Sequence, residues 1–196
     1  MEKNIRISAV MGIDPGASGG IAVLHKNAKT QVYHMPRDID DLKELFKYYS
    51  ETFETLAFIE KLSIRPDDVL MQGDSANMGK LYRVQKMMSN FEQLKIAAAF
   101  CNLSYCLVHP LKWQSTLNLR LKDKEEKSAR KRRYAQIASN LYPSVNVRLW
   151  NADALLIAHF GRYMLQYNRA WIMQNLPVRE KKSLFEQKNL QNNLLY

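Results

Sequence analysis

The chain has 196 residues, 46% of them apolar, which allows one domain with a packed core and excludes a wholly disordered protein. Its 29 Lys and Arg residues against 19 Asp and Glu residues give a formal net charge of +10, which favours a polyanionic partner such as nucleic acid over a merely soluble basic surface. No apolar run approaches the roughly 20 residues of a membrane-spanning helix, and the first apolar stretch is too short for a signal peptide, so we expect a cytoplasmic protein without a membrane partner.

Short β-strands and one helix are predicted in the first third of the chain. Three strands come first, at about 5–13, 19–26 and 30–36, and the short turn-forming segments between them imply two antiparallel hairpins. A helix follows over residues 38–52, with Asp38 as its N-cap. A fourth strand is predicted at 55–64, before a polar loop at 65–74.

Helices dominate the rest of the chain. A long helix is predicted from about 75 to 102 and a fifth strand over 104–110. A short helix or turn follows over 110–119, then a basic amphipathic helix over 122–143 and an apolar helix over 151–168. Residues 169–196 lose clear periodicity, so we divide the chain into one domain, residues 1–168, and a C-terminal tail or extra helix, residues 169–196.

The order of these elements predicts an α/β fold with a five-stranded mixed sheet flanked by helices. Because crossover connections between parallel strands are right-handed, the fourth and fifth strands are expected to lie parallel to the first, in the order 3-2-1-4-5. The first and fourth strands are then neighbours. Ligand sites in open α/β sheets favour the carboxyl ends of such adjacent strands.

Three acidic residues stand where this topology would bring them together. Asp14 follows the first strand, Glu60 interrupts the apolar end of the fourth, and Asp153 lies in the first turn of the apolar helix. Taken singly, Asp14 is equally a turn cap and Asp153 a helix cap, whereas a buried Glu60 is costly unless it is paired or bound to a metal. Three carboxylates together suit Mg²⁺ or Mn²⁺, and two such ions can activate water and stabilise the leaving oxygen in phosphodiester hydrolysis.

Four ordered segments resemble the RuvC-like Holliday-junction resolvases of the RNase H-like nuclease superfamily. They are GIDPGASGG at 12–20, FIEK at 58–61, LVHPLKWQ at 107–114 and ADALLIAHFGR at 152–162, and the resemblance spans about residues 8–165. The PLKW and DALLIA-x-x-GR segments are closer to the phage-type branch than to the cellular one. The resemblance implies an RNase H-like fold, a bacterial or phage origin, and a homodimeric crossover junction endodeoxyribonuclease that cuts four-way DNA junctions with two Mg²⁺ ions per active site, for which Mn²⁺ can substitute.

Carried over by this resemblance, Asp14, Glu60 and Asp153 match the catalytic carboxylates that bind metal in the family. The family usually has a fourth ligand, an Asp or His three residues before the last Asp. Here that residue is Trp150, which cannot ligate a metal, and Asn151 is the nearest polar substitute, with a weaker amide oxygen.

DNA contacts are expected mainly on the basic helix, since Lys and Arg side chains bind phosphates with little sequence preference. A solvated helix face with pairs such as Glu126–Arg130 is the plainer interpretation of the same residues. The loop at 65–79 is a candidate for insertion at the crossover, and the long helix after it offers either a dimer interface or ordinary core. The expected DNA-binding residues are Lys80, Lys112, Lys124, Lys127, Arg130, Lys131 and Arg133.

Other classes of protein stay open on the sequence. An RNA-processing nuclease of the same superfamily fits the composition equally well, and Trp150 favours a basic nucleic-acid-binding protein with a decayed site. An actin-like phosphotransferase also opens with a hairpin rich in Asp and Gly. That class needs a second, repeated domain, and no second hairpin of this kind follows residue 100.

Overall fold

The computed structural model describes residues 7–16, 18–62, 78–121 and 125–177, which form a five-stranded mixed sheet between two layers of helices. The strands are β1 (Ala9–Ile13), β2 (Gly20–His25), β3 (Gln31–His34), β4 (Thr55–Glu60) and β5 (Ser104–Val108). Their order is β3-β2-β1-β4-β5. The first three pair antiparallel, and β1, β4 and β5 are parallel, so the predicted hairpins, crossovers and strand order are confirmed.

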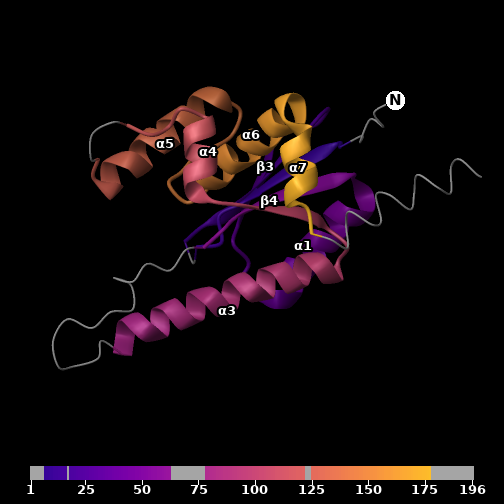
Figure 1. Cartoon of the computed structure of the whole chain (residues 1–196), viewed down its shortest axis with the longest axis horizontal. Coiled ribbons are helices and arrows are strands. Elements are labelled where there is room, and N and C mark those ends of the chain that lie inside the picture. The colour runs from indigo at the N-terminus through magenta and orange to yellow at the C-terminus, as the bar shows by residue number, and fades with distance from the viewer. Residues whose placement is uncertain (1–6, 17, 63–77, 122–124, 178–196) are drawn as a thin grey trace, which may run out of the picture.

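The helices divide between the two faces of the sheet (Figure 1). They are α1 (Ile39–Thr52), α3 (Met78–Phe100), α4 (Pro110–Thr116), α5 (Lys127–Leu141), α6 (Ala152–Tyr167) and α7 (Arg169–Asn175). Helices α1 and α3 build one apolar core with the sheet, and α4, α5, α6 and α7 build the other. Alternate residues of the strands point to opposite cores, which is the reason that β1, β2 and β4 are apolar on both faces.

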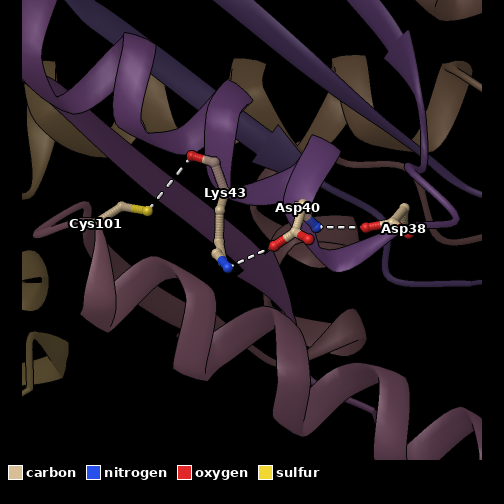
Figure 2. Close-up of polar contacts among 4 residues, drawn as sticks. All are labelled: Asp38, Asp40, Lys43 and Cys101. Carbon is tan, nitrogen blue, oxygen red and sulfur yellow. Dashed lines mark hydrogen bonds and ion pairs between the residues drawn. The ribbon is translucent and has the colours of Figure 1, made fainter.

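Helix α1 begins where the sequence predicted, and its start is tied to the end of α3 (Figure 2). The Asp38 carboxylate accepts a hydrogen bond from the Asp40 backbone N–H at 2.6 Å, as expected of an N-cap. Lys43 forms an ion pair with Asp40 at 2.6 Å, and the Cys101 thiol donates to the Lys43 carbonyl at 3.5 Å. These contacts fix the first turn of α1 beside the residue that follows α3.

Helix α3 packs through its second half. Phe91, Leu94 and Ala98 are buried against the sheet and α1. Leu81 and Tyr82, in the first turns, are 47% and 64% exposed. Phe91 is therefore a core residue, and the first half of α3 presents an apolar surface to solvent.

The observed elements are shorter than predicted at several ends. The basic helix starts at Lys127, and residues 122–124 lie outside the described part of the chain, as do the whole predicted loop at 65–74 and residues 178–196. The segment after residue 168 begins with α7, which buries Ile172 and packs against α6 and β5. Among the described helices, none is both long and apolar enough to span a bilayer.

Helix α6 lies directly on the backbone of β1 at Gly12. A Cβ atom placed on Gly12 would lie 2.2 Å from the carbonyl oxygen of Ala154 and 2.3 Å from the backbone nitrogen of Ala158. Farther along the helix, a Cβ on Gly161 would lie 2.4 Å from the Phe58 ring. The helix axis can approach the sheet this closely only because both positions lack a side chain.

We expect Gly12→Ala to destabilise the protein by at least the 1–3 kcal/mol typical of an overpacked core, because the added methyl meets helix backbone that cannot rotate away. The free energy of unfolding in urea measures the effect. Gly79→Ala, which makes the same change at an exposed position in the first turn of α3, is the matched control and should be neutral or stabilising. Equal stability of Gly12→Ala and wild type would contradict the close approach of α6.

Candidate active site

Asp14 lies one residue beyond β1, inside the glycine-rich turn that leads to β2. Its carboxylate oxygen Oδ1 accepts a hydrogen bond from the Gly16 backbone N–H at 3.0 Å, and its own N–H donates to the Gly20 carbonyl at 3.0 Å. A Cβ on Gly19 would lie 2.2 Å from the Asp14 carbonyl oxygen. The turn therefore wraps tightly around Asp14 and fixes its half-buried side chain.

Glu60 is the residue beside Asp14 on the next strand. The parallel register runs from Ala9 opposite Thr55 to Ile13 opposite Ile59, and its next step places Asp14 beside Glu60. Side chains alternate along a strand, so Asp14 and Glu60 both point to the face of the sheet that α6 covers. The sequence prediction that these two acids meet at the carboxyl ends of β1 and β4 agrees with this register.

Trp113 holds Glu60 in place. Its indole Nε1–H donates to Glu60 Oε2 at 2.7 Å, and the ring is 1% exposed. Trp113 is a core residue, and its hydrogen bond to Glu60 was not predicted from the sequence. The only signal in the sequence was its place in LVHPLKWQ, directly after the fifth strand.

Asp153 reaches the same end of the sheet from α6. Ala154 and Ala158 contact Gly12, and Gly161 contacts Val10, so α6 runs antiparallel to β1 and its first turn lies toward Asp14. Asp153 precedes Ala154 and is half-buried. Three acids from two strand ends and one helix start therefore share one region.

Electrostatics show that the three carboxylates interact. Burial and the negative charge of Asp14 raise the pKa of Glu60 to about 7, against the hydrogen bond from Trp113, which lowers it. Burial and the charge of Asp14 likewise raise the pKa of Asp153 to about 6. Burial also raises the pKa of Asp14 itself, while its bond from Gly16 lowers it. Each acid resists ionisation, because burial, joined for Glu60 and Asp153 by the charge of Asp14, disfavours its charged form.

Helix α5 brings positive charge to this cluster. Lys131 favours the ionised forms of Asp14 and Asp153, and Arg130 favours those of Glu60 and Asp153, because each lowers the pKa of these acids. Arg130 is exposed and Lys131 half-buried. Both predicted DNA-binding residues therefore face the acids closely enough to act on their charge.

The Arg133 side chain is bonded within the chain. Its guanidinium donates to both carboxylate oxygens of Glu125, at 3.0 and 2.7 Å, and to the Leu119 carbonyl at 3.0 Å. A guanidinium engaged in this way braces the start of α5 against the chain after α4. These bonds favour a structural role for Arg133 over the DNA contact expected from the sequence.

The remaining predicted DNA contacts are scattered. Lys127 is exposed at the start of α5, and Lys112 is exposed on α4 with its ammonium 5.9 Å from the centre of the Trp171 ring. The backbone of Lys80 belongs to the first turn of α3, and Lys124 lies outside the described residues. The predicted Glu126–Arg130 pair is not among the ion pairs found in the described part of the chain.

The position of the missing fourth ligand is filled by aromatic packing. The Trp150 ring stacks on His34, with centroids 3.6 Å apart, and a Cβ on Gly20 would lie 2.8 Å from it. Asn151 is fully buried, its Oδ1 accepts from the Arg148 N–H at 2.8 Å, and its Nδ2 donates to the Asn146 carbonyl at 3.1 Å. These bonds favour a loop-fixing role for Asn151 over the metal ligation suggested by the sequence.

The donor chemistry of the cluster fits a hard divalent cation. Carboxylate oxygens are the ligands that Mg²⁺ prefers, and buried acids with raised pKa values gain most from a nearby positive charge. In the part of the chain that the structure describes, no group of three His, Cys, Asp or Glu side chains that could hold a metal ion is found. The fit to Mg²⁺ therefore rests on the carboxylate chemistry of the three acids alone.

Known proteins resemble this chain in structure and not in sequence. No protein-family model and no curated protein matches it. The structure of Thermus thermophilus RuvC aligns with a TM-score of 0.50 and 16% identity over 81% of this chain and 95% of that chain. The complex of T. thermophilus RuvC with Holliday junction substrate aligns with a TM-score of 0.52 and 14% identity over 82% and 96%. At such identities the likeness shows the fold, which is the RuvC type of RNase H-like fold that the sequence predicted.

The raised pKa of Glu60 predicts how stability depends on pH. Folding raises this pKa from 4.5 to about 7, so the folded protein holds the proton more tightly than the unfolded chain. Without divalent metal, the free energy of unfolding should therefore fall as the pH rises from about 4.5 through 7. Glu60→Gln cannot titrate and should lessen this fall by an amount on the order of 3 kcal/mol, measured by urea unfolding across that range.

Trp113→Phe gives an independent check, because it keeps a buried aromatic ring and removes only the N–H donor. That donor stabilises ionised Glu60, so its loss should raise the pKa of Glu60 in the folded protein and extend the fall in stability to higher pH, with the start near pH 4.5 unchanged. If the free energy of unfolding of Glu60→Gln depended on pH in the same way as that of wild type, Glu60 would not titrate in this range.

Proposed function

We propose that the protein is a divalent-metal-dependent endonuclease that hydrolyses phosphodiester bonds in branched DNA, with the four-way junction as its substrate. The observation that carries the proposal is the register that sets Asp14 beside Glu60, with Asp153 brought to the same face by α6. Within the RuvC-like resolvases we favour the phage-type branch, on the PLKW and DALLIA-x-x-GR segments. Resolution of junctions would give it a role in DNA recombination and repair.

The three carboxylates are the proposed metal ligands. When bound, Mg²⁺ or Mn²⁺ ions supply an activated water and stabilise the leaving oxygen of the scissile bond. The chain supplies the rest. Gly16 and Trp113 orient one oxygen each of Asp14 and Glu60, and burial keeps bulk water from screening their charge.

Positive charge on α5 is the proposed means of drawing the substrate to the acids. The first turns of α5 carry Lys127, Arg130 and Lys131, and the chain as a whole carries a net charge of +10. Phosphates held there would lie between these cations and the carboxylates. Such contacts give affinity for any DNA shape, so selectivity for branched DNA must come from geometry.

A homodimer is part of the proposal, because a junction with two-fold symmetry needs two cuts, one from each active site. The first half of α3 supports it. Leu81 and Tyr82 are exposed there, beside half-buried Val84, Met87 and Met88. An apolar helix surface of this kind suits a second copy of the same chain.

Asp14→Asn should abolish cleavage of four-way junctions in Mg²⁺ while leaving junction binding within a few-fold of wild type. The amide oxygen can still accept from the Gly16 N–H, so the turn should persist while the ligand charge is lost. Cleavage and gel-shift assays on the same preparations measure both properties. Addition of Mg²⁺ should raise the melting temperature of wild type more than that of the variant.

A panel of four-way junction, linear duplex, single-stranded DNA and structured RNA tests the substrate class. Preferred cutting of RNA would favour an RNA-processing nuclease, and binding without any cutting would favour a decayed site. Full junction cleavage by Asp14→Asn would remove the metal-site assignment itself.

Charge removal on α5 should distinguish the side chains that bind DNA, Arg130 and Lys131, from Arg133, which stabilises the fold. Arg130→Gln combined with Lys131→Gln should weaken binding to all DNA shapes, and each lost phosphate contact should lower the slope of log affinity against log salt by roughly 0.9. Arg133→Gln should leave that slope unchanged and lower the melting temperature, because it breaks the brace to Glu125. A slope change in Arg133→Gln alone would reverse the two assignments.

A further inference from the structure

A groove of about 560 Å³ lies along the free edge of the sheet, at β5. Leu107 and His109, alternate residues at the end of β5, form part of one wall, and Trp171 and Leu176, from α7 and the residue after it, form part of another. Lys61 and Lys112 complete it. Its volume falls in the range of roughly 300–1,000 Å³ that ligand-binding pockets occupy.

The charge of this groove suits an anion. Lys61 and Lys112 are both exposed, and among the described residues none that lines the groove is acidic. The Lys112 ammonium lies 5.9 Å from the centre of the Trp171 ring, so a cation and an aromatic surface adjoin. Phosphate bound by lysine next to an aromatic ring is the combination that proteins use to bind single-stranded nucleic acid.

Trp171 is held in a defined orientation. It is half-buried, and its ring meets Phe160 edge-on, with centroids 5.7 Å apart and planes at 85°. A fixed aromatic side chain loses little conformational entropy when a base stacks on it. Stacking of a base on such a ring contributes about 1–3 kcal/mol and tolerates any base.

The groove begins one residue away from the acids. Lys61 follows Glu60, and its backbone N–H donates to the Val108 carbonyl at 2.8 Å, which extends the pairing of β4 with β5. Neighbouring residues of a strand point to opposite faces, so Glu60 faces α6 and Lys61 faces away from it. Lys112 likewise precedes Trp113, whose indole binds Glu60. A strand at the acids would need to pass only around the edge of β5 to enter the groove.

We propose that this groove binds one unpaired strand of the DNA substrate next to the scissile bond. Lys61 and Lys112 bind its phosphates, and an unstacked base lies against Trp171. The proposal deepens the nuclease function proposed above and rests on it for the position of the scissile bond. It assigns the α7 segment, after residue 168, to substrate binding.

Binding of a short fluorescein-labelled oligothymidylate and of a duplex of equal length, without divalent metal, tests the base site. Trp171→Ala should weaken binding of the single strand about 5- to 150-fold, the equivalent of one stacked base, and leave duplex affinity within about two-fold. Trp171→Phe keeps an aromatic face and should recover most of the loss. Thermal unfolding of each variant checks that the contact with Phe160 has not been essential to the fold.

Lys61→Glu tests the phosphate site at an exposed position where folding is not at risk. It should weaken single-strand binding and lower the salt slope by at least the roughly 0.7 expected of one phosphate contact. The matched control is Lys26→Glu, the same charge change in a second groove lined by Lys26 and Arg162. Lys26 follows β2, whose carboxyl end lies at the opposite end of the sheet from Glu60.

Two outcomes would contradict the proposal that the groove binds single-stranded DNA. One is equal single-strand affinity in wild type, Trp171→Ala and Lys61→Glu, which would mean that another occupant, such as residues 178–196 or a protein partner, fills it. The other is an equal loss in Lys61→Glu and Lys26→Glu, which would reduce the effect to overall charge. Wild type that binds DNA but cuts no substrate would instead defeat the nuclease proposal, and the binding comparison would still decide the groove.

Discussion

The contact of α6 with the backbone of β1 is the constraint on which the candidate site depends. Ala154 and Ala158 lie where the side chain of residue 12 would be, so the distance between helix and strand is set by the absence of a Cβ atom. Because α6 runs antiparallel to β1, this contact carries its first turn, and Asp153, toward the end where Asp14 and Glu60 already lie side by side. A larger residue at position 12 would lift the helix and move one acid away from the other two.

The same close packing makes the site electrostatically costly. Three acids are placed in a half-buried region, and their pKa values rise because burial and mutual repulsion disfavour their charges. The fold offsets this only in part, through the Trp113 N–H bond to Glu60 and the nearby charges of Arg130 and Lys131. Residual repulsion of this kind is common where a protein must bind a cation, since a site that was neutral by itself would have little affinity left for one.

Features that depend on periodicity and topology, such as the strand order, could be predicted from the sequence. Contacts that depend on how far a long side chain reaches could not. Strand alternation and the right-handed crossover were enough for the order 3-2-1-4-5 and for the meeting of Asp14 with Glu60. Arg133 looked like its basic neighbours, because nothing local shows that Glu125 and the Leu119 carbonyl lie within its reach. The hydrogen bond from Trp113 to Glu60 joins residues 53 positions apart, a separation that no local pattern reports.

The arrangement of positive charge around the acids bears on substrate shape. Helix α5 lies on the face of the sheet that α6 covers, while Lys61 points away from that face at the edge of β5. Lys112 and Trp171 belong to α4 and α7, on the same side of the sheet as α5, so only the Lys61 wall of the groove lies beyond this edge. A continuous stiff duplex resting on α5 would have to bend sharply to reach Lys61 as well, and sharp bending of duplex DNA costs several kcal/mol. A strand that leaves its duplex at a branch point is single and flexible there. If the groove binds such a strand, the two basic regions together would favour branched over linear DNA, although each alone would recognise only phosphates and bases without sequence preference.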